Sequence, residues 1–246
     1  MKNLLILGFV CLFSATALAG EPRSYQIGDE AFEGYHAMPE AASKGLVLII
    51  HDWDGLTDYE IRRAEMLAEM GYEAFAVDLY GAGNRPESTE AKKVETGKLY
   101  QDRERMRRLI LGGLDAARGD AKKQAVIMGY CFGGAAVLEL ARSMKAEDIA
   151  GYATFHGGLK TPEGQSYSGE TAPILIAHGG ADNAIPMADV AALAEELEAA
   201  GVTYEIEVYS GAPHAFTVLG SPRYQEVADQ KSWQAFTEFL GANLVE

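Results

Sequence analysis

Three residues in separate segments of this sequence have the types and the order that nucleophilic catalysis requires. Cys131 lies within the hexapeptide GYCFGG at 129–134, Asp182 ends the segment HGGAD, and His214 ends the segment GAPH. A cysteine attacks a carbonyl carbon as its thiolate, and a histidine can accept the thiol proton. An aspartate hydrogen-bonded to the other ring nitrogen would fix the orientation of that histidine. Together the three side chains predict acyl transfer through a covalent intermediate.

The hexapeptide has the spacing of a nucleophile elbow, a strained turn that joins a strand to a helix. An apolar run at 125–128 predicts the strand, and a helix-like run at 135–144 predicts the helix. The residues two positions away from Cys131 are Gly129 and Gly133, and both must be small to leave the nucleophile exposed. The alternative is an ordinary glycine-rich turn in which Cys131 is a small buried hydrophobe.

An oxyanion hole needs N–H donors aimed at the oxygen of the reacting carbonyl group. The first donor is predicted to be the backbone N–H of Phe132, which follows the nucleophile. The second donor should come from the loop after the apolar run 46–50, where Trp53 is the candidate. Because both donors are backbone groups, this prediction concerns the path of the chain and depends little on the two side chains.

Asp182 and His214 each have a structural alternative. An aspartate in a Gly-Gly-Ala-Asp segment commonly serves the turn itself, and a histidine after Gly-Ala-Pro can equally lie on the surface. Catalysis is favoured because the residues occur jointly, each after a predicted strand, in the order nucleophile, acid, histidine that α/β-hydrolases use. The other histidines at predicted strand ends are expected to have structural or pocket-lining roles: His51, His156 and His178.

Strands and helices alternate along most of the chain, which predicts a mostly parallel central sheet with helices on both faces. The predicted strands are 25–27, 31–38, 46–50, 74–77, 125–128, 149–155, 173–177 and 203–209. The predicted helices are 58–70, 91–118 with a break near Gly97, 135–144, 187–200 and 224–240. Functional side chains of such sheets lie in loops beyond the carboxyl ends of the strands. We therefore predict a single-domain α/β-hydrolase fold over residues 20–246.

The first 19 residues have the pattern of a secretory signal peptide. Lys2 supplies a positive charge, residues 4–18 are apolar, and Ala17-Leu18-Ala19 is a small-x-small cleavage site. The apolar stretch is shorter than the roughly 20 residues that a membrane-spanning helix needs. We expect cleavage before Gly20 or Glu21, a periplasmic or secreted location, and no stable membrane anchor after cleavage.

Removal of the signal peptide would also remove Cys11 and leave Cys131 as the single cysteine. A single cysteine cannot form an internal disulfide, and an accessible thiol is a liability in an oxidising compartment unless it is used. This favours a functional Cys131, although a deeply buried thiol would also survive there.

The composition is strongly acidic, with a formal net charge of −15 and a pI of about 4.8. Such a surface would repel nucleic acid phosphates, so a nucleic acid partner is excluded. The arginines of the segment 102–108 alternate with acidic residues in a helical pattern, which predicts a solvated, salt-bridged face. The five histidines show no metal-ligand spacing. Neither a metal nor an organic cofactor is implied.

At this point the sequence resembles the dienelactone hydrolase family, whose members are α/β-hydrolases with a cysteine nucleophile. The similarity covers nearly all of residues 20–246 and rests on GYCFGG at 129–134, DLYG at 78–81, HGGAD at 178–182 and PHAF at 213–216. The combination of segments is specific to the family, whereas each segment alone is not. The resemblance implies Cys131, Asp182 and His214 as the catalytic triad.

The resemblance also brings Asp52 into the site. In the family, a glutamate on the first active-site loop interacts with the nucleophilic cysteine and takes part in its activation. Asp52, one methylene shorter, is the matching residue here. A carboxylate beside a thiol raises the pKa of the thiol unless the carboxylate accepts the proton itself. Asp52 should therefore accept the proton in the resting state or stand clear, and its alternative is a carboxylate at a loop end.

Two positions depart from the pattern of the dienelactone-cleaving members of the family. Those enzymes bind the substrate carboxylate with two arginines, and the matching residues here are Ala82 and Val218. Arg85 and Arg223 are close in sequence and are the candidate replacements. A strongly acidic protein that lacks both arginines is a poor candidate for an anionic lactone.

Several aromatic residues near these segments would either line an apolar substrate pocket or belong to the core: Trp53, Tyr80, Tyr130, Phe132 and Phe216. We expect a hydrolase that cleaves a small-molecule ester, thioester or lactone, acting as a monomer or a small homo-oligomer. The alternative is a catalytically idle α/β-hydrolase fold used for binding or for thiol redox sensing. The two missing arginines and the single thiol are the features that favour this alternative.

Overall fold

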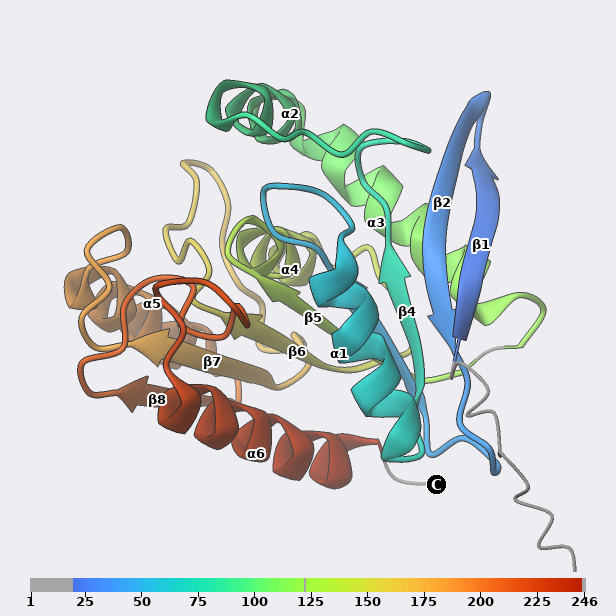
Figure 1. Ribbon diagram of the computed structural model, residues 1–246. Coiled ribbons are helices and arrows are strands. Elements are labelled where there is room, and N and C mark those ends of the chain that lie inside the picture. Colours follow the sequence, from blue (N-terminus) through green and yellow to red (C-terminus); the bar gives the residue numbers. More distant parts are fainter. Residues whose placement is uncertain (1–19, 122, 245–246) are drawn as a thin grey trace, which may run out of the picture.

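Within residues 20–121 and 123–244, which the computed structural model describes, eight strands form one sheet in the order β1-β2-β4-β3-β5-β6-β7-β8 (Figure 1). The strands are β1 Gly20–Ile27, β2 Glu30–Ala37, β3 Leu46–Ile50, β4 Glu73–Val77, β5 Ala125–Tyr130, β6 Ile149–Phe155, β7 Ile174–Gly179 and β8 Tyr204–Tyr209. The pairs β1–β2 and β2–β4 are antiparallel, and all other neighbours are parallel. The predicted signal peptide lies outside the described residues.

Helices cover both faces of this sheet, as the alternation of elements predicts. They are α1 Asp58–Glu69, α2 Thr89–Gln101, α3 Arg103–Arg118, α4 Phe132–Ser143, α5 Met187–Ala200 and α6 Glu226–Asn243. Side chains from α2, α3, α4 and α5 share one hydrophobic core with one face of the sheet, and α1 and α6 share a second core with the other face (Figure 1). The prediction of an α/β fold with a mostly parallel sheet between helical layers is confirmed.

The central strand β3 shows why the apolar runs form buried strands. All five of its residues, Leu46 to Ile50, have no solvent exposure. Alternate side chains enter opposite cores, so that Leu48 packs in the core of α3 and α4 while Ile49 packs in the core of α1 and α6. A strand buried on both faces therefore reads as a continuous apolar run instead of an alternating one.

The order of the sheet places a crevice above β3 and β5. From β3 the chain moves to β4 on one side, and it returns to β5 on the other side of β3. Loops that leave neighbouring parallel strands in opposite directions create a crevice at their carboxyl ends, where α/β proteins bind their ligands. The segment after β3 and the hexapeptide after β5 meet at this point.

Helix α1 begins in the loop that follows β3, and a capping box fixes its start. The Thr57 side chain accepts the N–H of Tyr59, and the Glu60 carboxylate accepts the N–H of Thr57 at 2.9 Å. Glu60 also accepts the N–H of Asp52 at 3.3 Å. The cap therefore ties the first turn of α1 to the start of the loop after β3.

The helix predicted at 91–118 breaks at Asp102, so the prediction of a break near Gly97 is wrong. Asp102 Oδ1 accepts the N–H of Arg105 at 2.8 Å and caps α3. Gly97 stays within α2, because one glycine costs a helix only about 1 kcal/mol whereas an aspartate cap satisfies an otherwise unpaired N–H. The helix predicted from Ala135 begins earlier, at Phe132, directly after the nucleophile candidate.

The arginines of segment 102–108 form a solvated, salt-bridged face only in part. Arg105 pairs with the exposed carboxylate of Glu30 at 2.5 Å. Arg103 and Arg107 instead pair with Glu139, a carboxylate of α4 that has no solvent exposure. Helical periodicity could not reveal this contact, because the partner belongs to a helix distant in the sequence.

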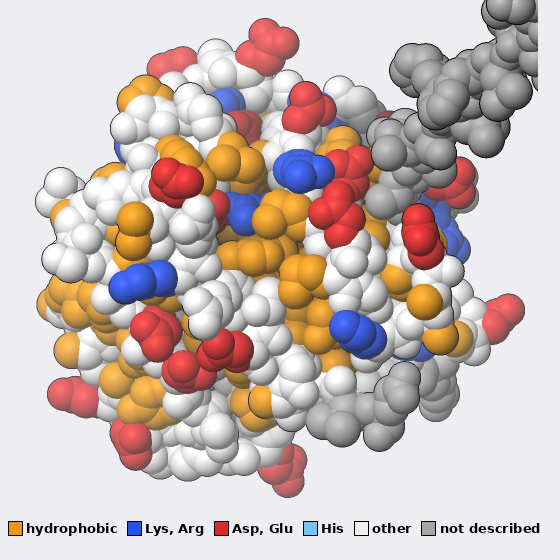
Figure 2. Space-filling model, turned by 60° about the horizontal axis from the view of Figure 1, so that its bottom comes forward, with side chains coloured by type: hydrophobic (Ala, Val, Ile, Leu, Met, Phe, Trp, Pro, Cys, Tyr) orange, Lys and Arg blue, Asp and Glu red, His pale blue; other side chains and the backbone are white. Residues whose placement is uncertain are grey.

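The surface shows the charge pattern that an acidic composition leads one to expect. On the face shown in Figure 2, isolated basic side chains are interspersed with acidic ones around a central area of exposed hydrophobic side chains. No helix within residues 20–121 and 123–244 is both long and apolar enough to cross a membrane.

Candidate active site

Cys131 occupies a strained turn between β5 and α4. Its φ of 50° and ψ of −110° form a backbone conformation that residues other than glycine rarely adopt. A Cβ atom at Gly129 would lie 2.4 Å from the carbonyl carbon of Gly133, and a Cβ atom at Gly133 would lie 2.3 Å from the carbonyl oxygen of Ile50. The two glycines are therefore required by close packing of the strand against the helix and against β3.

Cys131, His214 and Asp182 lie in one continuous chain of contacts. Cys131 Sγ is 3.1 Å from His214 Nε2, and His214 Nδ1 is 2.8 Å from Asp182 Oδ2. Because a carboxylate only accepts hydrogen bonds, the Nδ1 atom carries the ring hydrogen and Nε2 is left to accept the thiol proton. The structure thus brings together the three residues that the sequence singled out, in the arrangement that proton transfer from the sulfur requires.

Asp182 is held as a charged, oriented carboxylate at the end of β7. Its Oδ1 atom accepts the N–H groups of Ala184 and Ile185 at 2.8 and 2.9 Å, while Oδ2 faces His214. Although burial opposes it, the hydrogen bonds from His214 and Ile185 hold the pKa of Asp182 below its usual range. The carboxylate is therefore ionised at neutral pH and can stabilise an imidazolium form of His214.

The thiol of Cys131 is protonated at neutral pH. Burial raises its pKa to about 12; the charge that Asp52 acquires once it ionises at alkaline pH acts in the same direction, and the N–H of Phe132 opposes both. A resting thiolate–imidazolium pair is therefore not what this geometry favours. The sulfur would instead lose its proton to His214 as it attacks, which is general-base catalysis.

The two predicted oxyanion donors lie in different segments, Phe132 at the start of α4 and Trp53 in the loop after β3. The N–H of Phe132 starts helix α4 and acts directly on the Cys131 sulfur. The loop that contains Trp53 is anchored by Tyr80, whose hydroxyl group donates to the Trp53 carbonyl oxygen at 3.0 Å. Within the described residues, neither backbone N–H donates a hydrogen bond to a protein oxygen. Both donors therefore remain available to a substrate.

His51 joins the loops that follow β3 and β4. Its Nδ1–H donates to the carbonyl oxygen of Asp52 at 2.6 Å, and its Nε2 accepts the N–H of Leu79 at 3.2 Å. The ring is fully buried and lies 4.6 Å from that of Tyr80. Burial lowers the pKa of His51, which keeps it neutral, as an imidazole that both donates and accepts must be. His51 has a structural position.

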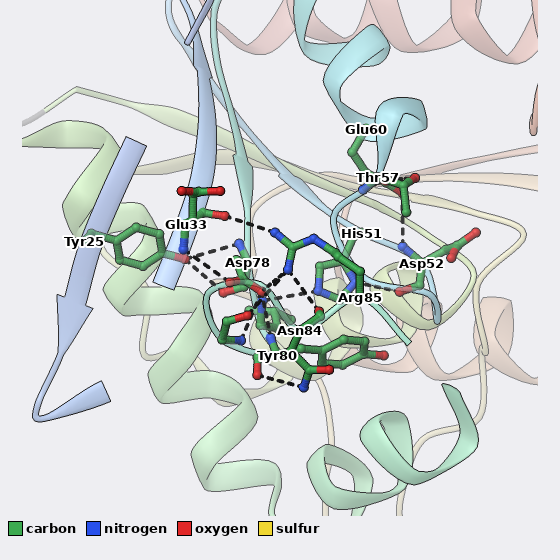
Figure 3. Close-up of polar contacts among 12 residues, drawn as sticks. Tyr25, Glu33, His51, Asp52, Thr57, Glu60, Asp78, Tyr80, Asn84 and Arg85 are labelled. Carbon is green, nitrogen blue, oxygen red and sulfur yellow. Dashed lines mark hydrogen bonds and ion pairs between the residues drawn. The ribbon is translucent and has the colours of Figure 1, made fainter. Parts of the chain in front are cut away.

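Asp52 lies beside Glu60 at the start of α1 (Figure 3), and Asp54 contributes a third carboxyl group to the same segment. The Oδ1 atom of Asp52 accepts the N–H of Asp54 at 3.0 Å, and Glu60 accepts the N–H of Asp52 itself. Burial, a hydrogen bond with the Asp54 carboxylate and the charge of Glu60 raise the pKa of Asp52 to about 9. Asp52 is therefore a neutral acid at neutral pH, and in that state it cannot accept the Cys131 proton.

The sequence did not reveal the residues that form hydrogen bonds with Thr217, in the loop that carries His214. Thr217 Oγ1 lies 2.8 Å from His156 Nε2 and 2.7 Å from the hydroxyl oxygen of Tyr59. Arg63, which is 1% exposed, donates to the Thr217 carbonyl oxygen at 3.0 Å. The available signal was the i, i+4, i+8 spacing of Tyr59, Arg63 and Leu67, which places an arginine on the buried face of α1.

His156 packs against the back of the His214 ring. The two ring centroids are 5.3 Å apart, and His156 has no solvent exposure. Burial and the charge that His214 can carry lower the pKa of His156 well below its usual value, so that its ring stays neutral. The expected structural role of His156 is consistent with this position.

Two of the predicted substrate-binding residues have other surroundings. Phe216 has no solvent exposure and packs against His156 and Tyr209, so of its two expected positions, pocket or core, it takes the core one. Arg85 donates to Asp78 Oδ1 at 3.4 Å and to the carbonyl oxygen of Asn84 at 3.0 Å (Figure 3). These contacts make Arg85 part of the scaffold of the loop after β4.

Arg223 and Tyr80 lie closer to the reaction centre. The positive charge of Arg223 lowers the pKa of the Cys131 thiol, against the larger effects of burial and Asp52. Tyr80 is partly exposed and acts through its anchor on the Trp53 carbonyl oxygen. Within residues 20–121 and 123–244, no group of three or more histidine, cysteine, aspartate or glutamate side chains could hold a metal ion.

Comparison with known proteins points to one family. Residues 32–244 match the dienelactone hydrolase family. A protein of Methylorubrum extorquens strain AM1, provisionally assigned as a carboxymethylenebutenolidase, is 27% identical over 91% of this chain and 80% of its own. The carboxymethylenebutenolidase of Rhodococcus opacus is 25% identical over 83% of this chain and 84% of its own.

A solved structure agrees with these relatives. The dienelactone hydrolase-like promiscuous phosphotriesterase P91, obtained from metagenomic libraries, superposes with a TM-score of 0.81 at 26% identity. The match covers 91% of this chain and 98% of P91. Sequence and fold comparisons therefore lead to the same group of proteins.

Proposed function

Because the chain belongs to the dienelactone hydrolase family, we propose that it cleaves a carboxylic ester, thioester or lactone by acyl transfer through Cys131. The observation that carries the proposal is the chain of contacts from Cys131 Sγ through His214 to Asp182, at 3.1 and 2.8 Å. The strained turn presents the sulfur where the loops after β3, β5 and β7 converge. Membership of the family implies a small-molecule substrate. The type of bond that is cleaved is our proposal.

In the first half of the reaction, Cys131 Sγ bonds to the carbonyl carbon and its proton moves to His214 Nε2. The negative charge that develops on the carbonyl oxygen accepts hydrogen bonds from the N–H groups of Phe132 and Trp53. When the tetrahedral intermediate collapses, the carbon–oxygen or carbon–sulfur bond to the leaving group breaks. The leaving group takes the proton from His214, and a thioester with Cys131 remains.

In the second half, water attacks the thioester carbonyl carbon while His214 accepts one of its protons. The second tetrahedral intermediate expels the Cys131 sulfur, which regains the proton from His214, and the carboxylic acid leaves. Asp182 remains ionised throughout and stabilises the imidazolium form of His214 in both halves. Asp52, as a neutral acid, does not add a negative charge beside the sulfur.

The proposal is tested by incubating the protein that lacks residues 1–19 with activated esters, thioesters and lactones, beside Cys131→Ala. We expect turnover that Cys131→Ala abolishes, and a mass increase on Cys131 equal to the acyl group when the reaction is quenched early. Turnover that persists in Cys131→Ala would falsify the assignment of the nucleophile.

The raised thiol pKa bears on the alternative of a redox-sensing protein. Sensor cysteines are low-pKa, accessible thiolates, whereas Cys131 is a protonated thiol with a pKa of about 12. This supports acyl transfer assisted by His214 over oxidation of a resting thiolate. A redox-sensing thiolate would react quickly with iodoacetamide at neutral pH, whereas the protonated thiol of Cys131 should react slowly, and turnover then decides whether the site is catalytic.

The location of the protein is a separate proposal. We propose export to the periplasm or the medium, on the basis of the charged, apolar and small-residue pattern of residues 1–19. The N-terminal residue of protein recovered from the producing organism should be Gly20 or Glu21 by mass spectrometry. Recovery of a chain that starts at Met1 would contradict this proposal without affecting the catalytic one.

A further inference from the structure

Helix α2 contacts both of the segments that carry the predicted oxyanion donors. Near the start of the helix, the Lys92 ammonium nitrogen lies over the Trp53 ring, 5.5 Å from the ring centre. Near the end of the helix, the Tyr100 ring lies 5.4 Å from that of Phe132. Lys92 and Tyr100 are about 12 Å apart along the helix, at about 1.5 Å per residue. One helix therefore reaches from the loop after β3 to the start of α4.

Lys92 also forms an ion pair with the residue that follows Trp53. Its Nζ atom donates to Asp54 Oδ2 at 3.2 Å. The side chains of Lys92 and Asp54 are 19% and 31% exposed, so the pair is partly sheltered from solvent. A cation is attracted both by the face of an indole ring and by a carboxylate. A single ammonium group thus holds two successive residues of the loop, which lies below α2 in Figure 1.

The loop after β3 and the start of α1 carry three carboxyl groups, those of Asp52, Asp54 and Glu60. Across residues 20–121 and 123–244, Lys92 is the one basic side chain that forms an ion pair with any of them. Although burial opposes it, a hydrogen bond from Asp52 and the charge of Lys92 hold the pKa of Asp54 below its usual range. Asp54 is therefore ionised at neutral pH, where it can pair with the Lys92 ammonium group.

The path of the loop directly after Asp54 depends on a glycine. Gly55 has a φ of 88°, which glycine adopts far more readily than other residues. Because glycine permits many backbone conformations, contacts elsewhere in the loop must select one path. The Tyr80 hydroxyl group holds the Trp53 carbonyl oxygen, and Lys92 holds the side chains of Trp53 and Asp54. The position of the Trp53 N–H group is thus set by contacts from two separate elements.

Helix α2 is itself anchored in the protein. Leu99 belongs to the core shared with α3 and α4, and Thr96 is also buried. Thr96 Oγ1 donates to the Lys92 carbonyl oxygen at 3.0 Å, and the Ser88 side chain caps the helix by accepting the N–H of Ala91 at 3.1 Å. A group on a helix is placed more precisely than a group on a loop. The core therefore fixes α2, and Lys92 passes that position on to the loop.

We propose that α2 braces the two oxyanion segments and that Lys92 is a positioning residue, which keeps the Trp53 N–H group aligned with that of Phe132. The proposal rests on the proposed function, because the oxyanion forms only if Cys131 attacks a carbonyl carbon. Lys92 acts through Trp53 and touches no reacting atom. Since the oxyanion exists only after attack, loss of the brace should lower kcat and leave KM nearly unchanged.

The test compares the same substitution at two neighbouring lysines of α2. Lys92→Met removes the charge and keeps an unbranched side chain that suits a helix. It should lower kcat about tenfold, less than the hundredfold to thousandfold that outright loss of an oxyanion donor costs, with KM changed by less than about twofold. Lys93→Met is the matched control, because Lys93 is exposed and forms no ion pair within the described part of the chain. It should leave kcat unchanged.

Two further variants separate charge from shape at position 92. Lys92→Arg should restore most of the wild-type kcat, because a guanidinium group can pair with Asp54 and stack on the Trp53 ring. Lys92→Gln should show the same loss as Lys92→Met, and it keeps the test decisive if Lys92→Met fails to fold.

Amide hydrogen exchange, followed by NMR, measures the position of the loop without turnover. The N–H groups of Asp52 and Asp54 are hydrogen-bonded within the segment, so they are protected while the loop is held. Their exchange should be at least about threefold faster in Lys92→Met than in the wild type and unchanged in Lys93→Met. Added salt should speed the exchange in the wild type, because it screens the ion pair.

Equal kcat values in Lys92→Met and Lys93→Met would overturn the positioning role, and so would a loss that appears in KM alone. Absence of turnover by the wild-type protein would instead reject the proposed function. In that case the exchange rates still decide on the brace: faster exchange in Lys92→Met alone supports it, and equal exchange in the two variants overturns it.

Discussion

Two loops on either side of Cys131 each present an aspartate, and the two aspartates are held in opposite protonation states. Asp182 follows β7 and Asp52 follows β3, and their exposed fractions, 7% and 8%, are nearly equal. The Asp182 carboxylate receives hydrogen bonds from His214 and from two backbone amides. Asp52 receives one backbone amide and lies among other carboxyl groups, so its pKa rises to about 9 by burial and by these neighbours.

The difference shows that surroundings, and neither residue type nor position at a strand end, assign the two roles. A buried carboxyl group ionises only where donors replace the water that it has lost. The loop after β7 supplies two backbone donors and His214 from the loop after β8 supplies a third, whereas the loop after β3 supplies further acids. Environments that push two pKa values apart separate the charged partner of His214 from a neutral acid beside the sulfur.

The largest effect should come from making the same isosteric change in both loops. Asp182→Asn should lower kcat about 10⁴-fold, because an amide no longer fixes the His214 tautomer or stabilises its charge. Asp52→Asn should change kcat by less than about threefold at pH 7, because asparagine resembles an aspartic acid that is already protonated. The measurement is kcat for the best ester found for the wild type.

A decrease in kcat of about a hundredfold or more in Asp52→Asn would contradict the assignment of Asp52 as a neutral acid. Such a loss is what removal of a proton acceptor costs, and it would mean that Asp52 takes the proton of Cys131 after all. His214→Gln serves as the control, since a loss of the same size in both variants would identify two acceptors.

Stability should depend on pH with opposite signs for the two aspartates. The folded pKa of Asp52 is raised above its unfolded value near 4, so the folded state binds more protons and wild-type stability falls as pH rises from about 4 to about 9. Asp52→Asn should therefore exceed the wild type at pH 8 by on the order of 1–3 kcal/mol and match it at pH 4.

Asp182 has a lowered folded pKa, so its contribution is present above about pH 4 and is lost as pH falls through the folded value. Asp182→Asn should therefore be less stable than the wild type at pH 8, with the gap closing at low pH. Urea unfolding at pH 4 and pH 8 measures the difference for Asp52→Asn, and unfolding at about pH 2.5, below the usual aspartate pKa, measures the closing gap for Asp182→Asn. A destabilised Asp52→Asn at pH 8 would show that Asp52 is ionised in the folded protein.

Above pH 9, the kcat/KM of the wild type should fall about tenfold relative to that of Asp52→Asn. In that range Asp52 loses its proton and places a negative charge where the sulfur and the reacting oxygen also become negative. The wild-type kcat/KM should decline there, whereas the decline should be absent in Asp52→Asn. Identical profiles for the two proteins between pH 8 and pH 10 would contradict a neutral Asp52.

The sequence predicted the part of the site that depends on the order of residues along the chain, which is the convergence of the three triad residues. Cys131, Asp182 and His214 follow strands β5, β7 and β8, and parallel strands bring such positions to one edge of the sheet. The distances of 3.1 and 2.8 Å within the triad are a consequence of that topology. The prediction succeeded because strand order and local glycine spacing are both written in short segments.

The protonation state of Asp52 and the direction of the Phe216 side chain depend on three-dimensional packing, which the sequence pattern does not give. Glu60 and Asp54 raise the pKa of Asp52 only because the start of α1 folds back onto the loop after β3. Phe216 could have lined the pocket or joined the core on sequence grounds, and its side chain enters the core. Side-chain direction within a loop is set by tertiary packing, so spacing alone could not decide it.

The smallest effect should arise from Tyr80, which anchors the loop after β3 at the Trp53 carbonyl oxygen. Tyr80→Phe removes the hydrogen bond to the Trp53 carbonyl oxygen and leaves the ring contact with His51 in place. Loss of one such hydrogen bond should lower kcat about threefold to tenfold with little change in KM, since the anchored loop carries the second oxyanion donor. Tyr100→Phe, which keeps a ring beside Phe132, is the matched control and should leave kcat unchanged. An unchanged kcat in Tyr80→Phe would show that the loop after β3 does not need its anchor, and an equal loss in both variants would show that the effect is not specific to the anchor.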